Sequence, residues 1–328
     1  MTKTIRDFGE QGLLKKLKAF CPPEIVGDDG AVLTLTNQHN LVVTTDILVD
    51  GVHFSDRTTP PDAVGWRGAA ANLSDLAAMG ATPIGITVGL SLTGDTPISW
   101  VESLYQGLSN CLQQYKTGIV GGDICRSQVN TLAITAFGQV SPNRVICRST
   151  AQPGDAIVVT GYHGNSRAGL ELLLNPPIGN QISPTERKFL LHAHQYPQPR
   201  LDVLQPLWRL NQGISVAGMD SSDGLADGIV QICQSSGVGA QIIREAIPIY
   251  NALSNLVAPE KAWEWILYGG EDFELVLCLK NQIATELVSS LGQPATIIGK
   301  ITAEKDIKLI DTNGGEELLT LTKGFKHF

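Results

Sequence analysis

The sequence predicts an α/β protein of two layered domains, and three observations lead to this prediction. The chain has 328 residues, about twice the length of a common single domain. Hydrophobic residues make up 43% of it and charged residues 17%, a balance that can bury sizeable cores. Segments with the period of a strand alternate with segments with the period of a helix in both halves, which is typical of sheets covered by helices.

The predicted strands are short runs rich in β-branched and apolar residues. The first of them covers 41–45 and ends at Asp46, where a polar loop is expected to begin. The others cover 131–140 in the first half and 155–160, 214–217, 273–279 and 296–301 in the second half.

The predicted helices have apolar residues at steps of three and four. One covers 62–79 and is ended by Gly80 and Pro83. The next covers 98–115, with Thr96 as its cap and Pro97 at its first position. In the second half, 156–174 is predicted as a strand, a glycine-rich turn and a helix, and a further helix follows Asp223.

A segment of turn composition, STAQPGD, follows Arg148 and marks the expected domain boundary. Residues 1–148 are therefore predicted as an N-terminal domain and 149–328 as a C-terminal α/β domain. The region 176–199 contains five prolines and gives no clear helical or strand pattern.

Charge and cysteine usage exclude several classes of function. The formal net charge is -8 without a basic run, so a surface that follows nucleic-acid phosphates is not expected. The six cysteines are too far apart in sequence for a CxxC redox pair or a zinc knuckle, and we expect reduced thiols. The chain shows neither a signal-peptide core nor an apolar run of membrane-spanning length, so we expect a cytoplasmic protein that does not bind membranes.

Acidic residues gather in short loops flanked by Gly, Ser or Thr, where strands end or helices begin. Carboxylates packed together repel each other unless a cation neutralises them, and oxygen ligands without His or Cys suit Mg²⁺. Bound Mg²⁺ in turn implies a polyphosphate substrate. The segments are GDDGA with Asp29, TTD with Thr44, Thr45 and Asp46, NLSDLAAMG with Asp75, GGD with Gly122 and Asp123, DSSDGL with Asp220, Ser222 and Asp223, and GGED with Glu271 and Asp272.

Each of these motifs alone is more often a structural turn than a catalytic loop. Common nucleotide motifs are missing: Gly299-Lys300 lacks the rest of a P-loop, and protein-kinase signatures are absent. The turn at Gly164 to Ser166 could bind phosphate at a helix N-terminus, although a plain strand-to-helix connection is the commoner case. His192 and His194 are interpreted as structural.

In this order, the loops resemble those of the thiamine-monophosphate kinase family, within the aminoimidazole-ribonucleotide synthetase-like superfamily. The resemblance runs from GDDGAVL through TTDILVDGVHF, NLSDLAAMGATP, GGD, PGDAIVVTG, DSSDGLADGI and GGEDFEL to KGFKHF, and so covers nearly the whole chain. It implies a two-domain fold in which the N-terminal sheet forms a barrel across a homodimer. It also implies that ATP and several Mg²⁺ ions bind in a cleft, and that the γ-phosphoryl group passes directly to thiamine monophosphate, giving thiamine diphosphate and ADP.

The resemblance also implies roles for single residues. Asp46, Asp75, Asp123 and Arg148 would be catalytic, and Gly122, Arg148 and Ser222 would contact ATP. His53 and Glu271 would lie on the thiamine phosphate side, together with Thr322, which stands where the family often has Trp. The implied Mg²⁺ ligands are Asp29, Thr44, Thr45, Asp46, Asp75, Asp123, Asp220 and Asp223.

Two alternatives remain open from the sequence. One is another ATP-using member of the superfamily, such as the purine-biosynthesis cyclo-ligase or selenophosphate synthetase, although Cys21 lacks the glycine-rich context that the latter needs. The other is a non-catalytic protein that binds Mg-nucleotide, which predicts binding without turnover.

Overall fold

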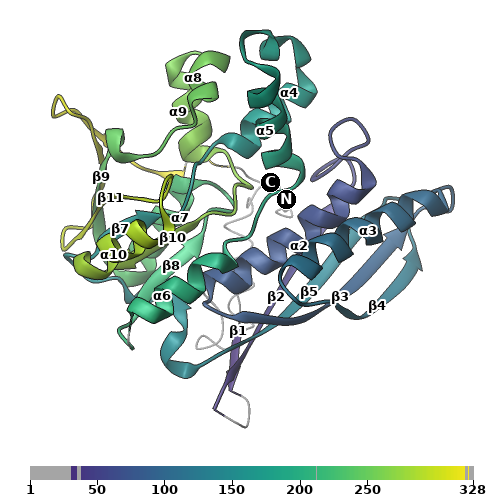
Figure 1. Ribbon diagram of the computed structural model, residues 1–328, viewed down its shortest axis with the longest axis horizontal. Helices are drawn as coiled ribbons and strands as arrows, with labels where there is room; N and C mark the ends of the chain where they lie inside the picture. The colour runs from purple at the N-terminus through teal and green to yellow at the C-terminus, as the bar shows by residue number, and fades with distance from the viewer. Residues whose placement is uncertain (1–30, 35–37, 212, 322–323, 325–328) are drawn as a thin grey trace, which may run out of the picture.

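Two sheets with helices packed against them make up the molecule, as Figure 1 shows. The computed structural model describes residues 31–34, 38–211, 213–321 and 324. The predicted site residues Asp29 and Thr322 lie outside the described residues. The two-layer α/β prediction is confirmed for both halves of the chain.

The first sheet has five strands in the order β1-β2-β5-β3-β4. Only β3 and β4 run parallel, and the other neighbours are antiparallel. Strand β4 lies at an edge, so one side of it has no neighbour within the described chain. The strands are β1 (Ala31–Thr34), β2 (Asn40–Val49), β3 (Thr82–Leu92), β4 (Ile119–Arg126) and β5 (Thr131–Val140).

Helices α2 (Pro61–Ala78) and α3 (Ile98–Gln114) pack on one face of this sheet (Figure 1). Glycines let the two helices approach closely: a Cβ on Gly65 would lie 1.9 Å from the carbonyl oxygen of Leu104, and one on Gly107 would lie 1.8 Å from that of Asp62. Most of α2 is buried, because it also contacts the second sheet. This helix is therefore the element that connects the two halves.

The second sheet has eight strands in the order β13-β12-β9-β11-β7-β10-β8-β6. It is mostly antiparallel, with parallel pairs at β12 with β9 and at β6 with β8. Its strands are β6 (Ile146–Cys147), β7 (Ala156–Val159), β8 (Val216–Asp220), β9 (Gly239–Ile243), β10 (Leu275–Leu279), β11 (Thr296–Thr302), β12 (Ile307–Ile310) and β13 (Glu316–Leu318).

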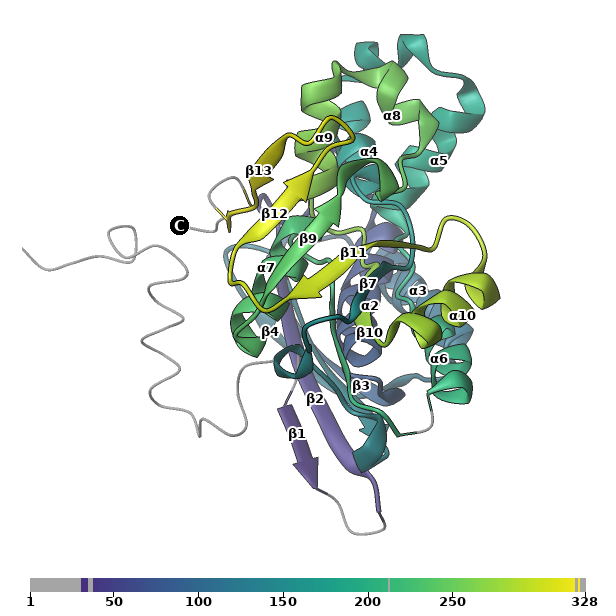
Figure 2. The same ribbon diagram turned by 90° about the vertical axis from the view of Figure 1, so that its left-hand side faces the viewer.

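In the described part of the second half, seven α-helices accompany the sheet. Helices α4, α5, α8 and α9 gather at one end of the molecule, at the top in both Figure 1 and Figure 2. The helices are α4 (Asn165–Leu174), α5 (Pro184–Gln195), α6 (Leu204–Leu210), α7 (Leu225–Ser236), α8 (Asn251–Leu256), α9 (Pro259–Tyr268) and α10 (Asn281–Leu291).

Most predicted elements form within a few residues of their expected bounds, and three details differ. Strand β2 continues to Val49, so Asp46 lies inside the strand, because residues 46–49 keep pairing with β5. Pro97 caps α3, while the Thr96 hydroxyl donates to Asn130 instead. Strand β8 is displaced toward the carboxyl terminus, which makes Asp220 its last residue.

The proline-rich region contains helix α5, which the sequence analysis left without an element. The helix begins with a capping box: the Ser183 hydroxyl accepts from the amide of Glu186, and the Glu186 carboxylate accepts from the amide of Ser183. Pro184 occupies its first turn, where a missing N–H costs nothing. The run Ser-Pro-Thr-Glu is the local signal that identifies this start.

Two findings concern the predicted cellular setting. No helix within the described ranges has both the length and the apolar character needed to cross a membrane. The five described cysteines are free thiols, and Cys111, Cys233 and Cys278 are buried.

Candidate active site

Helix α2 joins the predicted acidic loops of the two halves through consecutive residues. The Ser74 hydroxyl donates to Oδ2 of Asp220, at the end of β8, over 2.5 Å. The hydroxyl of Thr44, on β2, donates to Oδ2 of Asp75. Because neighbouring residues of one helix contact different sheets, the carboxylates of Asp75 and Asp220 belong to one site at the domain boundary.

Asp220 is the most buried carboxylate of this site. Burial raises its pKa to about 6; hydrogen bonds from Ser74 and Ser222 and the charge of Arg148 oppose this shift, and the nearby Asp46 carboxylate adds to it. Its Oδ1 is buried and has no hydrogen-bond partner among the residues that the structure describes. A buried oxygen of this kind beside a second acid matches the hard oxygen donors that Mg²⁺ prefers.

Arg148 is held beside Asp220 by helix α7. It lies in a short turn, Arg148–Thr150, and its Nη1 donates to Oε1 of Gln231 over 2.7 Å. Gln231 in turn donates to Asp227 over 2.6 Å. These bonds fix a positive charge at the site, where it can face phosphate oxygens.

The DSSD and GGED loops pack backbone against backbone. The amide of Glu271 donates to the carbonyl of Ser222 over 2.7 Å. A Cβ on Gly270 would lie 2.4 Å from that same carbonyl oxygen, so glycine is required there. The two loops that the sequence analysis singled out separately are therefore one unit.

Arg67, on α2, connects the residues predicted on the thiamine phosphate side. Its guanidinium donates to the carbonyl of His53 over 2.9 Å and forms an ion pair with Oε1 of Glu271. Burial would raise the pKa of Glu271, but the charge of Arg67 and its hydrogen bond lower it below its ordinary value. Glu271 is therefore ionised at neutral pH.

His194 also contacts this group, which its interpretation as a structural residue did not anticipate. Its Nδ1 lies 3.9 Å from Oε2 of Glu271 and 3.2 Å from the Ser166 hydroxyl. Burial and the charge of Arg67 lower the pKa of His194 to about 4. The imidazole is neutral at pH 7, so its contact with Glu271 is not an ion pair.

Gly122 and Asp123 lie apart from the residues around Asp220. The sheet register places Asp46 and Gly122 in one lateral row with two strands between them, a separation of about 14 Å between backbones. Thr45 points to the opposite face from Thr44, and its hydroxyl donates to the carbonyl of Ile134. The structure brings together Thr44, Asp46, Asp75, Arg148, Asp220 and Ser222, but not Thr45 or Asp123.

No three His, Cys, Asp or Glu side chains in the described part of the chain lie close enough to hold a metal ion. The metal assignments of the sequence analysis therefore stay predictions.

The glycine turn before α4 already has an anionic partner, the carboxylate of Asp272. Its two oxygens accept from the amides of Gly164 and Ser166 over 2.6 and 2.8 Å. Burial raises the pKa of Asp272 to about 7 despite these bonds. Two of the N–H groups that were considered for phosphate binding, those of Gly164 and Ser166, are thus bonded to the protein itself.

His163, in the same turn, predicts a pH dependence of stability. It is fully buried, and burial lowers its pKa to about 4, below the ordinary 6.5. Between these values the unfolded chain binds the proton and the folded chain does not, so this contribution is lost as pH falls. Compared with His163→Phe, the wild type should lose up to about 1.4 kcal/mol more of its unfolding free energy per pH unit between pH 6.5 and 4. Urea titrations check this, and the two curves should run parallel above pH 7.5.

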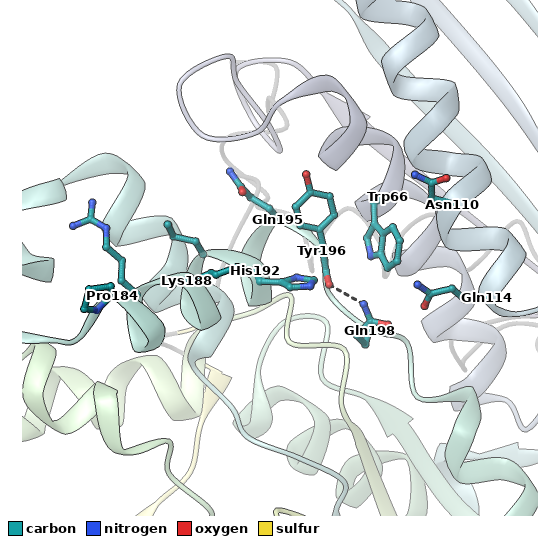
Figure 3. A pocket seen from close by; sticks show the side chains of 11 residues that line it. Trp66, Asn110, Gln114, Pro184, Lys188, His192, Gln195, Tyr196 and Gln198 are labelled. Carbon is teal, nitrogen blue, oxygen red and sulfur yellow. Dashed lines mark hydrogen bonds between the residues drawn. The ribbon is translucent and has the colours of Figure 1, made fainter.

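A cavity of about 700 Å³ opens between α3 and α5. Figure 3 shows the side chains that line it. Trp66, His192 and Tyr196 form its aromatic part, and amide side chains such as Gln114 and Gln198 face it. None of the predicted site residues that the structure describes lines it. The candidate site at the junction of β2, α2 and β8 is therefore separate from this cavity.

Sequence reasoning missed three residues of the site: Arg67, Ser74 and His194. One signal could have identified Arg67, because it is the only charged residue between Asp62 and Asp75 in a helix of otherwise small and apolar residues. A lone charge that a fold buries needs a partner. Ser74 and His194 carry no comparable signal.

Comparisons with known proteins identify the family to which the chain is similar. Family models match residues 27–140 as "AIR synthase related protein, N-terminal domain" and residues 152–312 as "AIR synthase related protein, C-terminal domain". The chain is 51% identical to the thiamine-monophosphate kinase of Synechococcus elongatus over 329 residues, covering 99% of this chain and 98% of the relative. It is 37% identical to that of Escherichia coli over 310 residues, covering 92% and 91%.

Solved structures are similar over the same length. One described as "AaThiL complexed with AMPPCP and TMP" has a TM-score of 0.84 and 31% identity, with both chains fully covered. Thiamine monophosphate kinase from Aquifex aeolicus has a TM-score of 0.77 and 31% identity, covering 93% of this chain and 97% of that one. The hydrogenase maturation protein HypE in complex with ATP, at 18% identity and a TM-score of 0.68, shares the fold.

Proposed function

The chain belongs to the thiamine-monophosphate kinase family, and from this membership we infer that it transfers the γ-phosphoryl group of ATP to thiamine monophosphate. The products are thiamine diphosphate and ADP. The structure described with AMPPCP and TMP, a relative at 31% identity, supports an ATP-like ligand and TMP as the pair of substrates.

One observation of this chain carries the proposal: helix α2 places Asp75 beside Thr44 and Ser74 beside Asp220, so acids from both halves face one junction. Arg148 and Ser222 lie beside Asp220. Glu271 contacts the carbonyl of Ser222 through its amide and is linked to His53 through Arg67. Residues expected to contact the two substrates therefore adjoin one acidic centre, which suits direct transfer between two phosphates.

The acidic centre fits Mg²⁺, since the buried Oδ1 of Asp220 has no hydrogen-bond partner within the described ranges and the neighbouring donors are hard oxygens. We propose that Thr44, Asp46, Asp75, Asp220 and Asp223 are Mg²⁺ ligands, with no more than two of these carboxylates on one ion and phosphate oxygens completing its coordination. Thr45, Asp123 and Asp29 are proposed as further ligands. Bound Mg²⁺ would neutralise the charge of the phosphates.

This chain's own residues act mainly by positioning. Arg148 can hold phosphate oxygens on the ATP side, where Gln231 fixes its guanidinium. The attacking atom is an oxygen of thiamine monophosphate that is already anionic, so the site needs no strong general base. Catalysis then depends on holding two anions in line.

We further propose a cytoplasmic homodimer formed through the first sheet. Ile47, Ile84, Val120 and Ile124 leave between 48 and 64% of their surface exposed on strands of this sheet. Exposed apolar side chains and the unpaired edge of β4 are features that an interface covers. Light scattering should give about twice the 35.1 kDa of the chain.

Mg²⁺ and ATP are expected to stabilise the protein together. Adding Mg²⁺ with AMPPCP should raise Tm, because a ligand at about 100 times its Kd adds about 2.7 kcal/mol to the unfolding free energy. Mg²⁺ alone or AMPPCP alone should raise Tm less, because each of them contributes part of the binding site of the other.

The deciding experiment is incubation with Mg-ATP and thiamine monophosphate, followed by chromatography for thiamine diphosphate. Product formation that stops with EDTA and returns with Mg²⁺ is the expected result. A raised Tm with Mg-AMPPCP but no product would replace the kinase proposal with that of a non-catalytic nucleotide-binding protein.

A further inference from the structure

Arg67 makes contacts in two directions from a buried position. Only 2% of its side chain is exposed. Its Nη1 donates to the carbonyl of His53, and lies 3.4 Å from the Thr59 hydroxyl, in the loop that follows β2. Its Nη2 pairs with Oε1 of Glu271 in the loop before β10. One guanidinium therefore connects a loop of the first half to a loop of the second.

The Glu271 loop needs support from outside itself. Glu271 has φ +68° and Phe273 has φ +52°, a region that residues other than glycine adopt at a cost in free energy. The Glu271 amide is bonded to Ser222, but its carboxylate is oriented by Arg67. Since 38% of the Glu271 side chain is exposed, the carboxylate can contact a ligand while Arg67 stays covered.

The His53 loop is fixed from the same point. The His53 ring accepts a hydrogen bond at Nδ1 from the amide of Val49 over 3.1 Å, and the His53 amide donates to the Val49 carbonyl over 2.9 Å. These bonds form a tight turn at the end of β2. Arg67 donates a hydrogen bond to the carbonyl of His53 in this turn. The distance between this turn and Glu271 is thus set by the two arms of the guanidinium.

The geometry is specific to arginine. A guanidinium presents its Nη atoms in a rigid plane, whereas the ammonium of lysine is a compact point charge on a flexible four-carbon stem. Burying the guanidinium is costly, and Nε of Arg67 has no hydrogen-bond partner in the described part of the chain. The buried guanidinium of Arg67 is found where its Nη1 and Nη2 atoms bond His53 and Glu271, two residues of the predicted acceptor side.

We propose that Arg67 is a positioning residue that locks the His53 and Glu271 loops to each other across the boundary between the two halves. It thereby sets the shape of the site for the phosphate acceptor. This second statement rests on the proposed function, since it takes His53 and Glu271 as the acceptor side. The lock itself is independent of the substrate.

The lock is tested by hydrogen exchange, without substrate, in Arg67→Met. The amides of His53 and Glu271 should both exchange about tenfold faster or more, because a single contact orders both loops. Arg67→Lys keeps the charge and should give an intermediate effect. A change at one amide only, or at neither, overturns the proposal.

Arg200→Lys is the matched control. Arg200 is also largely covered, and its Nη1 bonds one carbonyl, that of Thr160, and one glutamate, Glu274, both in the second half. Replacing it should leave the His53 amide unchanged. Faster exchange at His53 in this variant as well would mean that loss of any buried arginine loosens the fold, which would count against a specific lock.

The role in acceptor recognition is tested by calorimetry. In Arg67→Lys the Kd for thiamine monophosphate should rise about tenfold, as expected for the loss of one charge-assisted contact, while the Kd for Mg-AMPPCP stays within about twofold. Equal loss for both ligands would overturn the role in recognition. If the wild type does not bind thiamine monophosphate at all, the proposed function fails, whereas the exchange experiment still decides whether Arg67 forms the lock.

Discussion

Asp75→Asn is expected to reduce kcat by at least about two orders of magnitude while Tm changes little. The substitution keeps the shape of the side chain and an oxygen that can still accept from the Thr44 hydroxyl. It removes one negative charge from the junction of β2, α2 and β8, where the proposed Mg²⁺ sites need carboxylates. Asp46→Asn should behave alike, because the Asp46 carboxylate already acts on the pKa of Asp220.

Steady-state kinetics at saturating Mg²⁺ measure this effect, with Asp95→Asn as the control. Asp95 is an exposed residue that follows β3, so the same change of charge there should leave kcat within about twofold. Near-normal turnover in both Asp75→Asn and Asp46→Asn would remove these residues from the metal site. A large fall in Tm would instead assign Asp75 a structural role through Thr44.

The sequence predicts helix α2 well, but not what α2 does. Its apolar spacing and its end at Gly80 follow from local rules, and the helix forms within a residue of the expected bounds. That Ser74 contacts Asp220 is a relation between residues 146 positions apart. Such a contact depends on how β8 packs against α2, and no local pattern encodes this packing.

The position of Asp46 illustrates a second limit. The β-branched run before it predicts a strand, and the acid suggests that the strand ends there. Pairing with β5 continues through Val49, so the acid lies inside the strand and on the face that carries Thr44. Alternation along the strand then sends Thr45 to the other face. The residues of the Thr-Thr-Asp motif therefore lie on both faces of the sheet, and the motif alone does not predict this.

Asp123 and Thr45, the two predicted Mg²⁺ ligands that lie apart from the others in the single chain, are both accessible from outside the first sheet. Asp123 lies on the edge strand β4, and Thr45 points to the face that neither α2 nor α3 covers. Residues at an open edge and on an uncovered face are the ones that a second protomer could approach. In the proposed homodimer, the second protomer would therefore approach Asp123 and Thr45.

Glu271→Gln is expected to raise the KM for thiamine monophosphate by about 30-fold or more and to leave the KM for ATP within about twofold. Thiamine carries a fixed positive charge, and the Glu271 carboxylate is ionised and partly exposed, so it can attract that charge or accept from the pyrimidine amino group. Glutamine keeps the size of the side chain but removes the charge. It also leaves buried Arg67 without its counterion, so the orientation of the amide is less fixed.

A structural role for Glu271 gives a different result. If Glu271 only stabilised the loop before β10, the substitution would lower Tm and raise both KM values alike, because the same loop contacts Ser222 on the ATP side. Glu274→Gln is the matched control: Glu274 is also a glutamate paired with an arginine, and it accepts from Thr160 and Arg200 within the second half. This variant should lower Tm without separating the two KM values. Only a selective rise in the KM for thiamine monophosphate in Glu271→Gln places that carboxylate against the acceptor, since a loss of fold stability weakens both substrates together.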